Sequence, residues 1–248
     1  MKALFGETRQ YSAALSHDLF GVKDGSSVWY GGSQNLYQTQ REKTCGCGIA
    51  GAADIVLYID AINRIKAEGH RKVGNETKVT DSGIQIDITA FLAESAILRK
   101  KYIPIIPGRG VNAFLLAYGL NRYFKKHGMK YRSRWKWTFI KKWKIVERML
   151  KDDIPVILSI GNNFPIIWGK HELNLYVKDT ALTTEHETVY KKQQSVNGHF
   201  VVITAIEGNC LTVSSWGKKF YISIDEFDDY VKKHSTHIYS NILEIKKK

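Results

Sequence analysis

The sequence has few cysteines and no long apolar run. Three cysteines in 248 residues, an odd number, do not suit a disulfide scaffold. No apolar run reaches the roughly 18 residues that cross a bilayer. Residues 1–9 also lack the apolar core of a signal peptide. We therefore predict no membrane span and expect a cytoplasmic protein. A mature protein whose export signal has been removed is the alternative.

The sequence also lacks the motifs of common nucleotide, metal and nucleic-acid sites. It contains no P-loop, no paired zinc knuckles, no RNA-binding aromatic motif and no internal repeat. Cys45, Cys47 and Cys210 with a histidine are the one zinc alternative. Their Cys-x-Cys spacing is tighter than that of a structural zinc knuckle, and no second knuckle follows. We predict no metal and no cofactor.

Acidic residues are scarce relative to basic ones. The chain has 37 Lys and Arg against 24 Asp and Glu, a formal net charge of +13. The basic clusters fall at residues 99–101, 125–126, 141–144 and 246–248. Such a charge favours acidic substrates and anionic partners. The lysines are spread along the chain, however, so we expect no specific nucleic-acid site.

The residues that are present predict a folded α+β protein. Hydrophobic residues make up 44% of the chain, and its length suffices for one large domain or two small ones. Residues 1–43, rich in Gly, Ser, Gln and Tyr, predict an irregular N-terminal arm with one short strand. Residues 44–130 predict mainly helices, and residues 131–248 predict mainly an antiparallel sheet. We expect a single domain over residues 1–248.

Periodicity and end signals place the elements. Helices are expected over 47–67 with Gly69 as the cap, from 87 to 98, over 112–124, over 141–151, and from 225 onward. Strands are expected over 131–137, 155–160, 200–206, 211–217 and 220–224, with a polar hairpin or flap over 168–195. The strand over 155–160 is almost entirely apolar, which predicts a central position in the sheet.

A thiol lies at the start of the first predicted helix. Apolar residues recur at helical spacing at positions 49, 52, 53, 56, 59 and 62, so the helix begins near Cys47. The unpaired N–H groups and the positive dipole end of a helix N-terminus favour a thiolate. This arrangement suits a nucleophilic cysteine. A small buried cysteine on a core helix is the alternative.

His199 is the candidate base. It opens an apolar strand, whereas the other seven histidines fall in polar or helix-terminal settings. Strand pairing about a turn centred on Gly208 brings residues 214–216 back to the start of this strand, so Ser214 can reach the imidazole. A nucleophile, a base and a residue that orients the base form the general triad. A strand-edge histidine bonded only to backbone is the alternative.

These residues resemble the papain-like cysteine peptidases, and among them the bacterial branch similar to bacteriocin-leader peptidases. Residues 47–52 resemble its Cys-Gly-Pro-Ala-Ser/Ala helix start, and residues 198–203 its Gly-His-aromatic-Val-Val-Val strand. Residues 214–217 resemble its Asn-Ser-Trp-Gly or Asp-Pro-Trp-Gly, and residues 222–227 the Ile-Ser-x-x-x-Phe helix that follows. Residues 151–157 resemble its Gly-Lys-Pro-Val-Ile segment.

The resemblance implies a papain-like fold and a role for each matching position. Cys47 is the implied nucleophile, His199 the base, and Gln40 the side chain of the oxyanion hole. Gln38 is the fallback, because the offset from Gln40 to Cys47 is one residue longer than usual. Cys45 is the alternative nucleophile. We prefer Cys47, because the helix motif aligns from it and it lies closer to the helix dipole.

The chain departs from the family at the orienting residue. Ser214 stands where the family has Asn or Asp, and Asp225 is a weaker candidate for the same role. The implied activity is thiol-dependent hydrolysis of a peptide, isopeptide or other amide bond in a peptide or protein substrate, with acyl transfer as a variant outcome. Because serine carries no charge that would stabilise imidazolium, the alternative is a weak or inactive papain-like protein that binds peptides.

Overall fold

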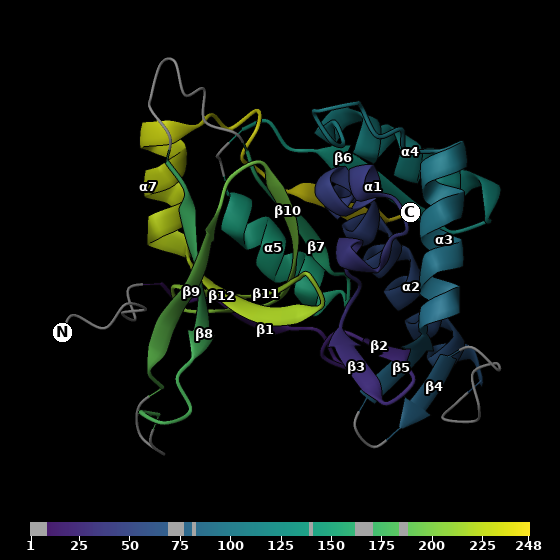
Figure 1. Ribbon diagram of the computed structural model, residues 1–248, viewed down its shortest axis with the longest axis horizontal. Helices are drawn as coiled ribbons and strands as arrows, with labels where there is room; N and C mark the ends of the chain where they lie inside the picture. Colours follow the sequence, from purple (N-terminus) through teal and green to yellow (C-terminus); the bar gives the residue numbers. More distant parts are fainter. Residues whose placement is uncertain (1–8, 69–76, 81–82, 139–140, 162–170, 184–187) are drawn as a thin grey trace.

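The computed structural model describes residues 9–68, 77–80, 83–138, 141–161, 171–183 and 188–248 (Figure 1). Its α-helices are α1 (Gln40–Cys45), α2 (Cys47–Glu68), α3 (Ile88–Lys101), α4 (Ala113–Lys126), α5 (Lys142–Lys151) and α7 (Ile224–His234), and Gln34–Leu36 form the 3-10 helix η1. The described chain is therefore a mixed α+β protein with largely antiparallel sheets, as the sequence predicts.

A seven-stranded sheet forms one half of the molecule. Its strand order is β1-β10-β11-β12-β8-β9, and β7 pairs with β10 beside β1. The bounds are β1 (Ser12–Ala14), β7 (Val156–Ile160), β8 (Leu173–Lys178), β9 (Tyr190–Val196), β10 (His199–Glu207), β11 (Cys210–Ser215) and β12 (Lys218–Ser223). All pairs in this sheet are antiparallel. The predicted hairpin is present as β8 and β9, although residues 168–170 and 184–187 of that prediction lie outside the described residues.

Strand β10 is the centre of this sheet. Its first half pairs with β7, from His199 opposite Ile160 to Ile203 opposite Val156, and its second half pairs with β1. Strand β11 lies along its other edge. All five residues of β7 are buried, which confirms a buried strand near residues 155–160. Its expected central position is wrong, because within the sheet β7 pairs only with β10 and its apolar residues are buried by packing.

Helix α2 packs between this sheet and the other helices. It contacts β10 and β7 on one side and α3 and α4 on the other (Figure 1). Its fully buried residues include Ile49, Ala52, Ala53, Ile55 and Ile59. Helices α3 and α4 begin at Asp87 and Asn112, whose side chains accept hydrogen bonds from the first-turn N–H groups. Helix α2 is thus the centre of the core.

Two smaller sheets flank these layers, and they show more order than the sequence predicts. The four-stranded sheet runs β3 (Ser27–Tyr30), β2 (Gly21–Asp24), β5 (Gly83–Asp87) and β4 (Thr77–Thr80). The other pairs β6 (Tyr131–Trp135) with β13 (Leu243–Lys247), a strand that the sequence pattern did not reveal. Residues 9–43 contain three strands, η1 and the start of α1 instead of an irregular arm. The predicted Gly69 cap lies outside the described residues.

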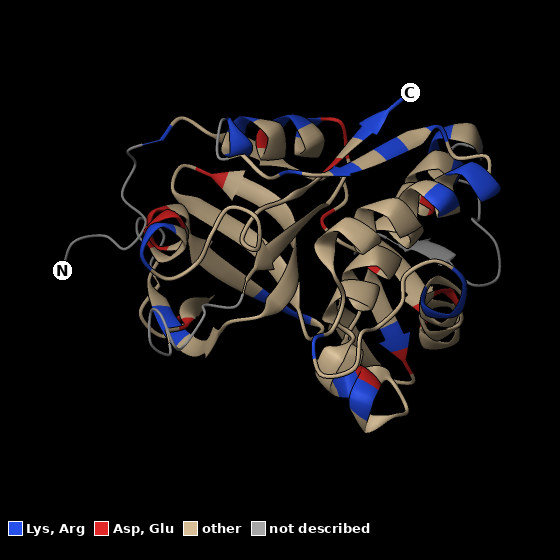
Figure 2. Cartoon of the chain, turned by 90° about the horizontal axis from the view of Figure 1, so that it is seen from above, with Lys and Arg blue, Asp and Glu red and all other residues tan. Residues whose placement is uncertain are grey.

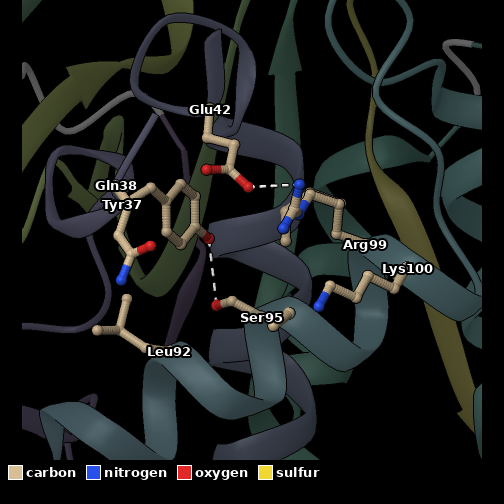
Figure 3. Close-up of a pocket in the computed structure, with 9 residues that line it drawn as sticks. Tyr37, Gln38, Glu42, Leu92, Ser95, Arg99 and Lys100 are labelled. Carbon is tan, nitrogen blue, oxygen red and sulfur yellow. Dashed lines mark hydrogen bonds and ion pairs between the residues drawn. The ribbon is translucent and has the colours of Figure 1, made fainter. Parts of the chain in front are cut away.

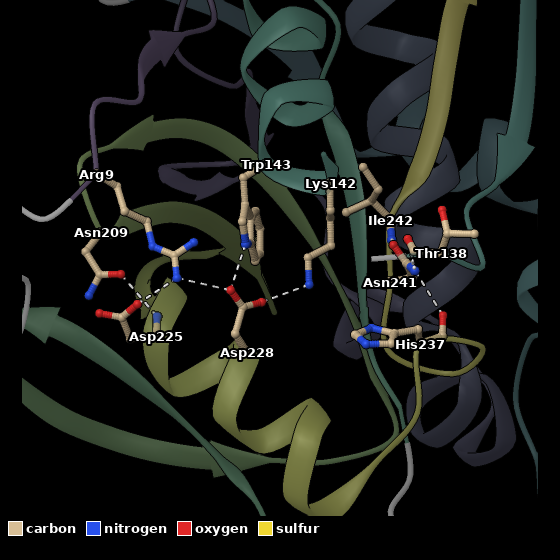
Figure 4. Close-up of polar contacts among 10 residues, drawn as sticks. All are labelled: Arg9, Thr138, Lys142, Trp143, Asn209, Asp225, Asp228, His237, Asn241 and Ile242. Atoms are coloured by element: carbon tan, nitrogen blue, oxygen red, sulfur yellow. Dashed lines mark hydrogen bonds and ion pairs between the residues drawn. The ribbon is translucent and has the colours of Figure 1, made fainter. Parts of the chain in front are cut away.

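A polar cluster ties the start of the described chain to the C-terminal helix (Figure 4). Asp228 of α7 accepts hydrogen bonds from Lys142 Nζ at 3.0 Å and Trp143 Nε1 at 3.0 Å, and Arg9 lies 3.2 Å from the same carboxylate. The Lys142 ammonium also lies 4.4 Å from the centre of the Trp143 ring. Burial lowers the pKa of Lys142 and Asp228 opposes that shift. A buried lysine needs such partners, so this cluster joins α5 directly to α7.

None of the described helices is both long and apolar enough to cross a membrane. Lys and Arg side chains occur on helices and strands throughout the described chain, including β13 near the C-terminus (Figure 2). The charge is therefore distributed over several elements.

Candidate active site

Cys47 is the first residue of α2, as predicted. Helices α1 and α2 are separated only by Gly46. A Cβ at Gly46 would lie 2.3 Å from the carbonyl oxygen of Glu42 and 2.7 Å from the Tyr37 ring, so the tight junction needs glycine. The Cys47 side chain is buried within the fold. Cys45, at the end of α1, is half-buried and lies outside the cavity that Cys47 lines.

The Cys47 thiol is buried away from water, and backbone N–H groups lie near it. Burial raises its pKa, and the backbone N–H groups of Phe200 and Gly48 act in the opposite direction. The net effect of the surroundings favours the neutral thiol. The helix N-terminus therefore does not by itself produce a thiolate here, because desolvation is the larger effect.

His199 is the first residue of β10 and is buried. Its Nε2 lies 2.7 Å from the Ser215 hydroxyl oxygen. Burial lowers its pKa to about 3, so the imidazole is neutral at physiological pH. When Nε2–H donates to Ser215, Nδ1 is unprotonated and is the ring nitrogen able to accept a proton.

The partner of His199 is Ser215, which corrects the predicted Ser214. The Ser214 hydroxyl donates to the Tyr30 carbonyl oxygen at 2.7 Å. Ser214 pairs with Val202, so both side chains point to the same face of the sheet. Because side chains alternate along a strand, Ser215 shares the other face with His199. The weaker candidate, Asp225, lies at the start of α7 in an ion pair with Arg9.

Trp216 covers the imidazole. Its ring stacks on that of His199, with centroids 4.2 Å apart and planes inclined by 13°. Trp216 and Gly217 form the two-residue turn between β11 and β12, with φ angles of +49° and +70°. Both positive values match a type I′ hairpin turn. A positive φ at an aromatic residue costs on the order of 1 kcal/mol, and such strain is typical of functional sites.

The side chain suited to an oxyanion hole is Gln34, not Gln40. Gln40 is exposed at the first position of α1, and Gln38 is exposed outside the cavity. Gln34 in η1 is buried and lines the cavity with Cys47. Its Nε2 donates to the Lys43 carbonyl oxygen at 2.5 Å, which leaves the second N–H of the amide for another acceptor. Helix α1 lies between Gln34 and Cys47, so the two residues are further apart in the sequence than the family spacing predicts. Gln34 therefore could not be recognised from its distance to the cysteine.

Asp54 is a further polar residue of the site that the sequence reading missed. It lies seven residues after Cys47, two helical turns along the same face of α2. Its Oδ1 accepts a hydrogen bond from the Gly32 N–H at 2.7 Å. Burial raises its pKa to about 8, against the effect of that hydrogen bond. Asp54 thereby ties the segment leading to Gln34 to the nucleophile helix. In the sequence, Asp54 could have been recognised as the one acidic residue within the apolar face of the predicted helix.

One cavity of about 20 Å³ is lined by Cys47, His199, Ser215, Trp216, Gln34 and Asp54, and the predicted Ser214 also borders it. This space holds about one water molecule. We call it the Cys47 cavity. It brings together the Cys47 thiol, the His199 imidazole and the Gln34 amide.

The zinc alternative finds no support from geometry. Cys210 opens β11 opposite Ser223, far along the strand from Ser215. Within the described ranges, no group of three or more His, Cys, Asp and Glu side chains is placed to hold a metal ion.

No protein-family model, curated protein or solved structure matches the chain.

Proposed function

We propose that the chain is a papain-like cysteine hydrolase, related to the bacteriocin-leader-peptidase-like branch, which acts on peptide or amide bonds. The observation that carries the proposal is the meeting of Cys47 and His199, from distant parts of the sequence, in one cavity with His199 bound to Ser215. The order of cysteine, histidine and orienting residue also follows the family.

The proposed reaction starts from a neutral pair. As the Cys47 sulfur attacks the carbonyl carbon, His199 Nδ1 takes the thiol proton and becomes imidazolium. The developing oxyanion accepts hydrogen bonds from the Cys47 backbone N–H and the free amide N–H of Gln34. His199 then protonates the leaving amine, which leaves a thioester on Cys47. Water, deprotonated by His199, releases the acid and restores the thiol. If an amine replaces water, the same steps give acyl transfer.

Ser215 and Trp216 hold the imidazole during these steps. The Ser215 hydroxyl oxygen lies 2.7 Å from His199 Nε2. In the proposed cycle this hydroxyl accepts from Nε2–H and fixes the tautomer, but it carries no charge to stabilise imidazolium. The stacked Trp216 ring limits rotation of the imidazole. We therefore expect slower turnover than in an enzyme whose histidine is oriented by a carboxylate or an amide.

A second candidate function is peptide binding without catalysis. It is favoured by the raised pKa of the Cys47 thiol and the lowered pKa of His199, which disfavour the thiolate–imidazolium pair. The net charge of +13 favours an acidic partner for either function.

Peptide cleavage and thiol alkylation separate the two functions. A mixed peptide library that includes acidic members is incubated with the chain and analysed by mass spectrometry. We expect cleavage by the wild type and by Cys45→Ala, and none by Cys47→Ala or His199→Ala. Iodoacetamide labelling then compares the two cysteines in one chain. Absence of any cleavage, together with a Cys47 alkylation rate unchanged by His199→Ala, would overturn the hydrolase and favour the binding protein.

A further inference from the structure

A second hollow lies beside α2. It has a volume of about 210 Å³ and lies between the segment from Tyr37 to Glu42 and helix α3 (Figure 3), and Ile49 of α2 also lines it. We call it the α3 pocket. Ile49 is two residues after Cys47, which places the two side chains on nearly opposite sides of α2. The α3 pocket is therefore separate from the Cys47 cavity.

The lining of the α3 pocket combines apolar side chains with one hydroxyl pair, in which the Tyr37 hydroxyl donates to Ser95 at 3.2 Å. Leu92 and Ala96 are one helical turn apart on α3 and line the pocket together with Ile49. Leu92 and Ala96 are half-buried, whereas Ile49 is fully buried. A buried cavity of about 150 Å³ accommodates a benzene ring, so this pocket has room for a branched alkyl chain or an aromatic ring.

The mouth of the pocket carries a net positive charge. Arg99 Nη1 lies 2.5 Å from Glu42 Oε1, and the guanidinium keeps further N–H donors (Figure 3). Lys100 is exposed, and no ion-pair partner for it occurs among the described residues. Two cations thus face one carboxylate.

The Glu42 carboxylate has little capacity left to accept further hydrogen bonds or to pair with a second cation. It accepts hydrogen bonds from the Thr39 hydroxyl at 2.7 Å and the Thr39 N–H at 3.2 Å in the capping box of α1. Although burial opposes its ionisation, Thr39 and Arg99 lower its pKa. Glu42 therefore stays ionised and balances Arg99 alone, which leaves the charge of Lys100 available to a ligand.

We propose that the α3 pocket binds an organic carboxylate with a small apolar body. The apolar body packs on Ile49, Leu92 and Ala96, and the carboxylate lies between Arg99 and Lys100 at the mouth. Two sources carry this chemistry, a free short-chain acid and the C-terminal residue of a peptide. This site goes beyond the proposed hydrolase and does not involve Cys47.

Titration of the full chain with 4-methylpentanoate tests the proposal. We expect saturable amide chemical-shift changes along residues 92–100 of α3 with a dissociation constant of about 1 mM, typical of so small a ligand. The uncharged 4-methylpentanamide is expected to bind at least tenfold more weakly. An acetylated tripeptide ending in leucine, with a free or an amidated C-terminus, distinguishes the sources: tighter binding of the free-carboxylate peptide than of the acid assigns a peptide end, and weaker binding assigns a free acid.

Two variants and one matched control complete the experiment. Lys100→Gln removes the unpaired charge and is expected to weaken acid binding about tenfold. Ala96→Leu fills the apolar part and is expected to abolish binding, with an otherwise native amide spectrum as the check on folding. Lys101→Gln, one residue further along α3 and outside the pocket lining, is expected to change nothing. No saturable change, equal binding of acid and amide, or equal weakening by Lys101→Gln would overturn the proposal.

Discussion

The Cys47 cavity and the α3 pocket border the same helix and treat charge in opposite ways. The first is a space of about 20 Å³ in which the thiol, the imidazole and the Asp54 carboxyl are all buried. The second is a space of about 210 Å³ in which the buried Glu42 forms an ion pair with the partly exposed Arg99. Burial shifts each group in the Cys47 cavity toward its neutral form.

Under the two proposals, one helix borders two sites of different chemistry. Desolvation in the Cys47 cavity opposes the separation of charge between thiol and imidazole, so the proposed reaction moves the thiol proton only as the sulfur attacks. Partial solvation in the α3 pocket lets cations remain charged, which suits recognition of an anion. The contrast predicts large pH effects from the cavity and small ones from the pocket.

Asp54→Asn is expected to have the largest effect. The carboxyl ionises near pH 4 in the unfolded chain and near pH 8 in the fold. Unfolding therefore releases a proton between these values, and this contribution is full below about pH 4 and lost as pH rises through about 8. The free energy of unfolding falls by up to about 1.4 kcal/mol per pH unit across that window. Asparagine does not titrate, so the Asp54→Asn variant lacks this fall in the free energy of unfolding. Urea denaturation of both proteins from pH 5 to 8 measures the difference.

His199 provides the opposing trend in the same measurement. Its pKa is lowered to about 3 in the fold, so its contribution is present above its ordinary pKa and lost as pH falls toward 3. In the wild type the two slopes offset each other between about pH 4 and 6.5. The Asp54→Asn variant should therefore lose stability steadily below about pH 6.5. An Asp54→Asn variant with the same pH dependence as the wild type would contradict the buried acid.

Ser215→Ala and Ser214→Ala form a matched pair. Each removes a hydroxyl bonded at 2.7 Å to a buried partner, so each is expected to cost about 1–3 kcal/mol of stability. Only Ser215→Ala leaves His199 Nε2 without its partner. We expect it to lower kcat/KM at least tenfold with KM nearly unchanged, while Ser214→Ala leaves kcat/KM close to the wild type. Equal kinetic effects would show that neither serine orients the base.

Trp216→Ala opens the Cys47 cavity. Loss of the stacked ring is expected to cost about 1 kcal/mol and to bring water to His199. The pKa of His199 then rises toward its ordinary value near 6.5. Proton NMR titration of the imidazole measures this change. A pKa that stays low in the variant would assign the desolvation to the surrounding core instead of Trp216.

Glu42→Gln tests the pocket side and is expected to have the smallest effect. It removes the ion pair between Arg99, whose side chain is 36% exposed, and Glu42, whose side chain is 10% exposed, and it weakens the capping box of α1. Because glutamine keeps the shape and an acceptor oxygen, and solvent screens the partly exposed Arg99, the loss is expected to be about 1 kcal/mol. Thermal unfolding measures it, with Lys100→Gln as the control that leaves stability within about 0.5 kcal/mol. A loss as large as that from Ser215→Ala would remove the contrast between the two regions.

Much of the fold follows from local patterns in the sequence. The caps at Asp87 and Asn112, the helical spacing after Cys47 and the apolar run at 156–160 each gave an element near its observed place. Strand β13 was missed because Leu243–Lys247 is short and ends in lysines, and its pairing with β6 is a long-range contact. Only one of the three strands before η1 was expected, because glycine and serine recur through that stretch and interrupt any alternating pattern.

The candidate site was predictable in its two reactive residues and not in its supporting ones. Cys47 at a helix start and His199 at the start of an apolar strand are local signals. Which serine faces His199 depends on the register between β10 and β11. Because Val202 pairs with Ser214, Ser215 lies on the same face of the sheet as His199. The position of Gln34 in the cavity depends on its hydrogen bond to Lys43 of α1. The contribution of Asp54 to the cavity depends on the packing of Gly32 against α2.

The sequence by itself determined the α+β composition, the helix that begins with Cys47 and the strand that begins with His199, because periodicity and caps act over a few residues. The tertiary structure alone decided which serine faces the imidazole, which glutamine enters the cavity and how the buried groups ionise. Those features depend on strand register and on the exclusion of water, both of which arise only when distant segments pack together.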